Sequence, residues 1–172
     1  MKRILEYPRI YNFYQRLIGS RPYLKKFKSR FLKIEDSMKI LDMGCGTAIL
    51  AIVAAKRGAQ KVCAIDIDER AYRNAIENAN LNNCSEIDVR LGGAEAIGDS
   101  KFDIILANIN KNILIADMSI YSQAINNEGL LFVSGFYSSD IEDIANTALK
   151  YNLNLIKKQE ENDWVSLKFK KN

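Results

Sequence analysis

Residues 38–47 read Met-Lys-Ile-Leu-Asp-Met-Gly-Cys-Gly-Thr, and this segment carries the clearest indication of the fold class. Residues 38–43 form a short apolar run typical of a buried strand. The two glycines lack a Cβ, so the backbone there can turn sharply and come close to a ligand. A nearly all-apolar segment over 48–57 predicts a helix. Thr47 can cap its start, and Gly58 stands where a helix C-terminal glycine belongs.

Strand and helix patterns alternate outward from this stretch. Five strands separated by helical segments predict a mostly parallel sheet with helices on both faces. The last two strands are joined by a short polar turn, so they form an antiparallel hairpin. The expected α/β fold is a seven-stranded doubly wound sheet, with strands over 38–43, 61–65, 86–91, 102–107, 129–136, 153–159 and 164–169 and helices over 48–57, 69–80, 114–125 and 141–149.

The N-terminal part differs in charge from the rest. The chain has 172 residues and a net charge of +4, and residues 1–33 hold ten of its Lys and Arg residues with a single acid. Apolar residues at helical spacing predict two helices within 9–32. We expect a single domain over 1–172, with a basic helical lead-in at 1–35 and an α/β core at 36–172.

Residue usage excludes several classes of site. The chain has no histidine, and Cys45, Cys63 and Cys84 form no CxxC pair. We therefore expect no metal, no histidine-based catalysis and no disulfide framework, and a reducing cytoplasm suits the thiols. No apolar run is long enough to cross a bilayer, and the first residues lack a signal-peptide core, so no membrane association is expected.

The carboxyl ends of the predicted strands carry a candidate nucleotide site. In doubly wound sheets, ligands bind beyond these ends, near the point where the strand order reverses. Asp42, Gly44 and Gly46 lie at the end of the first strand. Asp66 ends the second, where its carboxylate can accept hydrogen bonds from both hydroxyls of a ribose. A dinucleotide site would need a third glycine at position 49, which is isoleucine. The other alternative is that the two glycines only form a tight turn between strand and helix and bind no ligand.

Two further loops belong to this candidate site. After the third strand, residues 92–95 read Gly-Gly-Ala-Glu, and their backbone groups are placed to read an adenine edge, unless this is a plain surface loop. After the fourth strand, the side-chain carbonyl of Asn108 can accept a hydrogen bond from a nucleophilic nitrogen. Asn108 could instead cap the next helix, but Asn110 is the better candidate for that role.

These segments resemble the catalytic domain of bacterial ribosomal-protein lysine methyltransferases of the PrmA type. The resembling pieces are LDMGCGTAILAIVAAKRGA, AIDID, ANINKNIL, GLLFVSGFY and ENDWVSLKFKK, and two of them look like the Bacteroidetes form. The resemblance implies a class I methyltransferase fold, S-adenosyl-L-methionine as cofactor, and an amino group on a stalk-base protein of the large ribosomal subunit as acceptor. It implies cofactor contacts at Gly44 and Asp66, and a cofactor or substrate-amine contact at Asn108. Trp164 either lines the acceptor site or packs in the hairpin.

The expected site follows from the residues and the resemblance together. Asn108 is the expected catalytic residue, because it would orient the acceptor amine for in-line attack. Many methyltransferases carry an acid at the position of Gly93, so either Glu95 substitutes for it or backbone N–H groups alone read the adenine. The family's usual glycine at position 48 is Ala48. The expected cofactor contacts are Asp42, Gly44, Gly46, Asp66, Ile67, Gly93, Ala94 and Asn108.

Four functions compete on the sequence alone, and methylation of protein amino groups is favoured. A nucleic-acid methyltransferase would use the basic residues of 1–33 as its phosphate-binding footprint, although a solvated helix face explains them equally well. Asn108-Ile109 lacks the prolines and aromatic ring that base methylation uses. A small-molecule N-methyltransferase would use the N-terminal helices as a lid, and a non-catalytic module would keep only the fold. The expected partners are a ribosomal protein and, weakly, RNA.

Overall fold

The computed structural model describes residues 34–161 and 164–172. By its internal contacts the chain divides into two units, Met1–Glu35 and Asp36–Asn172. The two helices expected within 9–32 lie outside the described residues. The described elements are β1 (Lys39–Met43), α3 (Ile49–Lys56), β2 (Lys61–Asp66), α4 (Glu69–Leu81), β3 (Asp88–Leu91), η2 (Ala94–Ile97), β4 (Phe102–Asn108), α5 (Lys111–Ala124), β5 (Ile125–Tyr137), η3 (Ser138–Asp140), α6 (Ile141–Lys150), β6 (Leu153–Glu161) and β7 (Trp164–Lys171).

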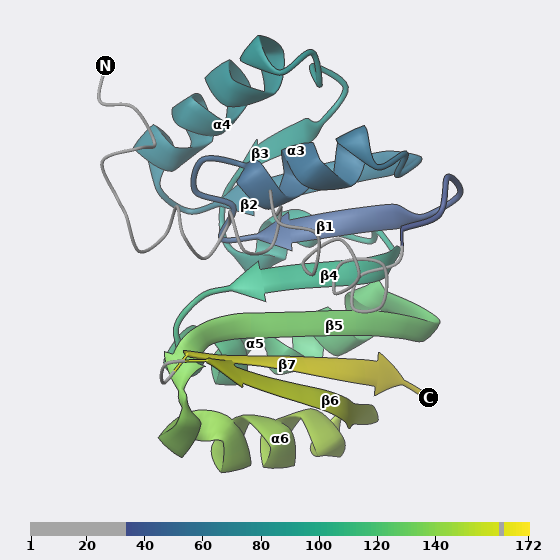
Figure 1. Ribbon diagram of the computed structural model, residues 1–172, viewed down its shortest axis with the longest axis vertical. Coiled ribbons are helices and arrows are strands. Elements are labelled where there is room, and N and C mark those ends of the chain that lie inside the picture. Colours follow the sequence, from purple (N-terminus) through teal and green to yellow (C-terminus); the bar gives the residue numbers. More distant parts are fainter. Residues whose placement is uncertain (1–33, 162–163) are drawn as a thin grey trace. The chain divides into compact units, whose positions relative to one another are not determined.

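The strands form one seven-stranded sheet in the order β3-β2-β1-β4-β5-β7-β6. β1 to β5 pair in parallel, and β7 is antiparallel to both of its neighbours. The arrows of β1 and β4 accordingly point one way and that of β7 the other (Figure 1). The strand order reverses between β1 and β4, where Met43 lies beside Ala107. The expected doubly wound sheet with an antiparallel hairpin is confirmed.

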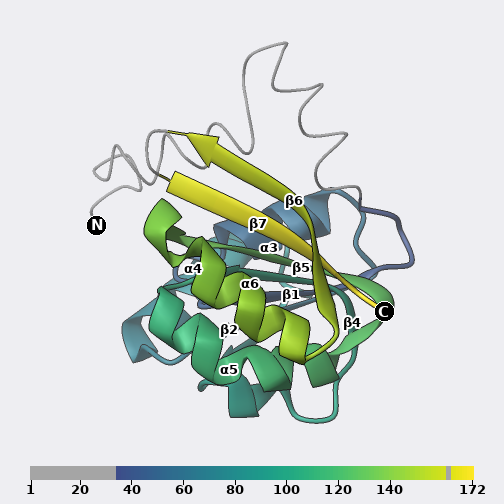
Figure 2. The same cartoon turned by 90° about the horizontal axis from the view of Figure 1, so that it is seen from below.

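Helices cover both faces of the sheet. α3 contacts α4, and α5 contacts α6, and Figure 2 shows α5 and α6 on one side of the strands and α3 on the other. The central strands are therefore buried on both faces, which explains their continuous apolar sequence: Leu41, Ile65, Ile105 and Leu131 have no exposed surface. Within the described ranges, no helix combines the length and apolar character needed to span a membrane.

The start of α3 differs from the expectation that Thr47 caps it. The cap is Ala48, in the left-handed region at φ 58° and ψ 25°, and no side chain bonds to the helix end there. The Ala48 N–H instead donates to the carbonyl of Cys45 at 2.8 Å. This tight turn sets the conformation of Ala48, where the Cβ of alanine adds strain that glycine would avoid. Gly58, at φ +93°, follows the helix end as expected.

Two strands begin two or more residues away from the expected position. β5 begins at Ile125, a residue expected to end the preceding helix, because the chain passes directly from α5 into the sheet and Ile125 pairs with Phe102. β3 begins at Asp88 and not at residue 86, since its pairing with β2 starts only there. Neither shift moves the carboxyl ends of the strands, so the predicted site keeps its place in the fold.

Candidate active site

The glycine turn after β1 depends on glycine for two reasons. Gly44 has φ +67°, and a Cβ at this position would lie 2.3 Å from Cγ2 of Ile109, which follows β4. The N–H groups of Gly44 and Cys45 donate to the carbonyl of Ile65 at 2.9 and 3.0 Å, which ties the turn to β2. Gly46, at φ +54°, has no atom within 4 Å of its Cβ position. The turn is thus tightly packed at Gly44 and open at Gly46.

Asp66 joins this turn to the end of β2. Its Oδ2 accepts a hydrogen bond from the Gly46 N–H at 2.8 Å, and its Oδ1 accepts one from the Asp68 N–H at 3.0 Å. Each carboxylate oxygen can accept a second hydrogen bond, so a vicinal diol such as a ribose can still be bound. The neighbouring Ile67 side chain is 78% exposed and adds an apolar surface beside the carboxylate.

Asp42 lies beneath the turn and is only 2% exposed. Its Oδ2 accepts a hydrogen bond from the Ala51 N–H at 3.0 Å, in the first turn of α3. Burial raises the pKa of Asp42 to about 7, with a small further rise from the charge of Asp66, while the hydrogen bond from Ala51 acts in the opposite direction. The carboxylate therefore fixes α3 against β1, and a direct contact with a cofactor stays a prediction.

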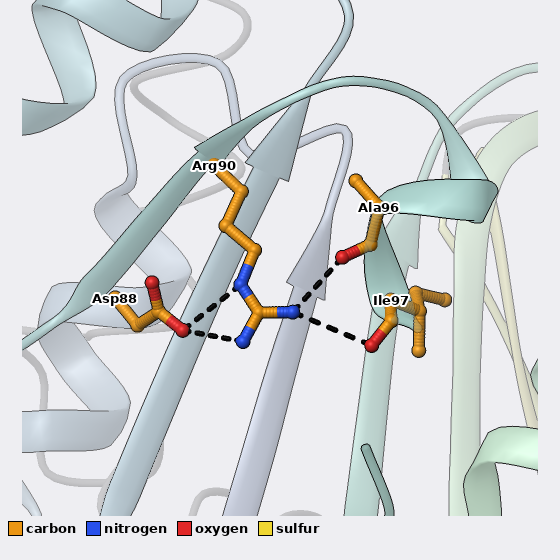
Figure 3. Close-up of polar contacts among 4 residues, drawn as sticks. All are labelled: Asp88, Arg90, Ala96 and Ile97. Atoms are coloured by element: carbon orange, nitrogen blue, oxygen red, sulfur yellow. Dashed lines mark hydrogen bonds and ion pairs between the residues drawn. The ribbon is translucent and has the colours of Figure 1, made fainter. Parts of the chain in front are cut away.

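The loop after β3 is held by its own side chains. The Gly93 N–H donates to Oε1 of Glu95 at 2.7 Å, and Ala94 is buried. Arg90 donates to the carbonyls of the last two residues of η2 (Figure 3). Arg90 was not predicted, because nothing in the neighbouring sequence indicates its carbonyl partners six and seven residues further along the chain.

Asn108 lies at the end of β4, partly buried beside β5. Its Oδ1 accepts a hydrogen bond from the hydroxyl of Ser134 at 3.1 Å. Gly135, at φ +98°, leaves the necessary space, because a Cβ there would lie 3.0 Å from this Oδ1 and 2.9 Å from the carbonyl of Ile109. Asn110 caps α5, as expected. Ser134 and Gly135 were not expected at the site, although the segment SGFY contains them.

The predicted residues thus lie at the carboxyl ends of four neighbouring parallel strands, β3, β2, β1 and β4. Gly46 bonds to Asp66, and Gly44 packs on the residue after Asn108. The glycine turn, the free acceptor capacity of Asp66 and the loop after β3 fit an adenosine-containing cofactor. The Trp164 side chain lies outside the described residues. Among the residues that the structure describes, no three His, Cys, Asp or Glu side chains are grouped to hold a metal ion.

Relatives that are similar in sequence include ribosomal protein L11 methyltransferases of several bacteria. A ribosomal protein L11 methyltransferase from Porphyromonas gingivalis is 49% identical over 133 residues, which are 77% of this chain and 46% of that protein. The corresponding protein from Bacteroides fragilis is 49% identical over 131 residues, 76% of this chain and 47% of its own length. The chain therefore spans about half the length of the curated relatives it matches.

Solved structures and a family model agree with this. A ribosomal protein L11 methylase from Lactobacillus delbrueckii subsp. bulgaricus has a TM-score of 0.77 at 29% identity, covering 87% of this chain and 77% of the other. An RNA methyltransferase from Salinibacter ruber, in complex with S-adenosyl-L-homocysteine, shares the fold at a TM-score of 0.69 and 14% identity, covering 88% and 92%. The sheet is thus that of the class I methyltransferases. Because the model of "Ribosomal protein L11 methyltransferase (PrmA)" matches residues 24–172, the chain belongs to that family.

Proposed function

We propose that this chain is an S-adenosyl-L-methionine-dependent methyltransferase that methylates amino groups of a ribosomal protein. One observation carries the proposal: the Asp66 carboxylate and the open Gly46 turn are bonded together where the strand order reverses. This is where doubly wound sheets bind nucleotides. Membership of the PrmA family supports the cofactor and the class of acceptor.

The residues divide the work of such a reaction between binding and orientation. When bound, the cofactor supplies a methyl group already activated by its sulfonium. Asp66 would accept hydrogen bonds from the ribose hydroxyls, and the Gly44 turn would let the backbone approach the cofactor closely. Asn108, held by Ser134, would accept a hydrogen bond from the acceptor amine and align its lone pair with the methyl group. Since the chain has no histidine, water is the expected acceptor of the amine proton.

Calorimetric titration with S-adenosyl-L-homocysteine tests the cofactor site. Asp66→Ala should weaken binding by about 1–3 kcal/mol, because the ribose hydroxyls lose a charged acceptor. Asp99→Ala is the matched control, because Asp99 is exposed and lies beyond the loop after β3. Equal affinity of wild type and Asp66→Ala would overturn the assignment of the ribose site. Thermal unfolding without ligand shows whether the loss of the Gly46 contact has disturbed the fold.

Transfer of labelled methyl groups tests the acceptor. The chain is incubated with labelled cofactor and, separately, with free ribosomal proteins, whole ribosomes, RNA and a metabolite extract. Label in a ribosomal protein is the expected result. Asn108→Ala should reduce the rate of labelling by a larger factor than it weakens cofactor binding. Label confined to RNA or to small molecules would refute the proposed acceptor but leave the methyltransferase activity standing.

The second part of the proposal is a weak contact with RNA. We also propose that the methyl transfer takes place in the cytoplasm. Residues 1–35 would act as a basic lead-in to the catalytic domain, and the supporting observation is the charge of residues 1–33 in the sequence. Replacing Lys25, Lys26, Lys28 and Arg30 with glutamine should weaken RNA binding and make its salt dependence shallower, because fewer counterions are released. If the wild type binds no RNA, or binds it independently of salt, the proposed RNA contact is refuted.

A further inference from the structure

The side-chain amide of Asn108 lies between two segments that follow neighbouring strands. Asn108 ends β4 and pairs in register with Ser134 of β5, whose hydroxyl donates to its Oδ1 at 3.1 Å. The chain after Asn108 enters α5, and the chain after Ser134 reaches α6 through η3. α5 and α6 lie side by side on one face of the sheet, as Figure 2 shows. The orientation of this amide therefore depends on how the two segments are held relative to each other.

Lys111 joins the two segments by ion pairs. Its Nζ lies 2.6 Å from Oδ2 of Asp143, in the first turn of α6, and 3.3 Å from Oδ1 of Asp140, at the end of η3. The side chains of Lys111 and Asp140 are 29% and 18% exposed, so solvent screens this pair less than a fully exposed one. The second oxygen of Asp140, Oδ2, accepts the N–H of Tyr137 at 3.0 Å. One carboxylate thus contacts both the last residue of β5 and the first residue of α5.

The stability of α5 does not account for a lysine at this position. The N-terminus of a helix carries a partial positive charge, so a cation in the first turn is unfavourable there. Lys111 is the first residue of α5, and this first turn holds no acidic side chain. Its two partners lie instead at the start of α6, where acidic side chains are favourable. The ion pairs therefore stabilise the contact between the two segments, and not the helix in which Lys111 lies.

We propose that Lys111 is a positioning residue for methyl transfer, an inference that rests on the proposed function. Through Asp140, Lys111 holds the end of β5 against the start of α5. This contact keeps the Ser134 hydroxyl and the Asn108 amide at hydrogen-bond distance, and the second lone pair of the amide oxygen stays directed at the acceptor amine. Displacement of an orienting group by about 1 Å can slow a reaction about a hundredfold. Lys111 acts on the acceptor through Asn108 and takes no part in binding the cofactor.

Single-turnover transfer of labelled methyl groups to free ribosomal proteins, with saturating cofactor, tests this role. Lys111→Met keeps the aliphatic stem and removes the charge. It should slow transfer about tenfold or more, while the calorimetric affinity for S-adenosyl-L-homocysteine and the unfolding temperature change little. Lys111→Arg can form both ion pairs again and should recover most of the rate. Arg73→Met is the matched control, because Arg73 forms an ion pair with Glu69 on α4, and it should leave the rate unchanged.

A double variant separates positioning from a general effect on the fold. In the Asn108→Ala background, Lys111→Met should slow transfer little further, because the residue on which Lys111 acts has been removed. If Lys111→Met slows transfer by the same factor with and without Asn108, the two residues act independently and the inference fails.

The NMR signals of the Asn108 side-chain amide test its position without any acceptor. They are identified by their loss in Asn108→Ala. They should shift in Lys111→Met, return toward their wild-type positions in Lys111→Arg, and stay in place in Arg73→Met. Unshifted signals in Lys111→Met would show that Lys111 forms only a surface ion pair, and the inference would be overturned. If the wild type transfers no methyl group to any acceptor, the proposed function fails, and these signals still decide whether Lys111 positions Asn108.

Discussion

The buried carboxylate of Asp42 should make the stability of this protein fall as the pH rises. Its pKa is about 7 in the folded chain, against 3.8 for an ordinary aspartate. Between these two values the folded state binds a proton that the unfolded state has lost, so the free energy of unfolding decreases with pH. The rise in the pKa from 3.8 to about 7 corresponds to about 4 kcal/mol in the free energy of unfolding. This stabilisation is fully present below pH 3.8 and is lost above pH 7.

Asp42→Asn isolates this contribution, because asparagine has nearly the same shape and does not ionise. We expect the variant to gain stability relative to the wild type by about 1.4 kcal/mol for each pH unit between 5 and 7, with a plateau above 8. Urea unfolding at pH 5, 6, 7 and 8 measures the difference, and Asp99→Asn controls for the change in net charge. The test is how this difference in the free energy of unfolding changes with pH, because the asparagine amide adds only a contribution that does not vary with pH. A difference that stays constant from pH 5 to 8 would refute the reasoning.

Three other substitutions probe the loops. Gly44→Ala should lower the free energy of unfolding by about 2–5 kcal/mol in thermal or urea unfolding, because the alanine would adopt a left-handed conformation and its methyl group would overlap Ile109. A loss below about 1 kcal/mol would mean that the two loops are less closely packed than described. Asn110→Ala should cost about 1 kcal/mol as a lost helix cap and leave calorimetric cofactor affinity unchanged. Gly135→Ala should displace Asn108 and slow single-turnover methyl transfer more than it weakens cofactor binding; equal losses would assign the position to the cofactor.

The order and type of the described strands and α-helices could be predicted because they depend on local patterns. Short apolar runs alternate with segments of helical periodicity, and this alternation predicted the parallel strands. The short polar turn before residue 164 predicted the antiparallel hairpin. Asn110 was correctly predicted as the cap of α5, since asparagine is a preferred residue at the start of a helix.

What could not be predicted depends on contacts between distant segments. Ala48 became the start of α3 because its N–H closes a turn on Cys45, and this turn has no signature in residue type. The position of Ser134 beside Asn108 follows from the register of β4 against β5, which the sequence alone leaves open. Arg90 finds two carbonyl partners only once η2 is folded.

The position of β7 has a consequence for synthesis on the ribosome. β7 follows β6 in the chain but lies between β5 and β6 in the sheet. Until Lys171 has been translated, β6 has no partner, and the free edge of β5 presents unpaired N–H and C=O groups. At about 5–20 residues per second, the segment from Ser138 to Lys171 takes roughly 2–7 s to synthesise. The nascent protein therefore passes through a window in which an open strand edge is exposed to other chains, and the window closes only when the last strand inserts.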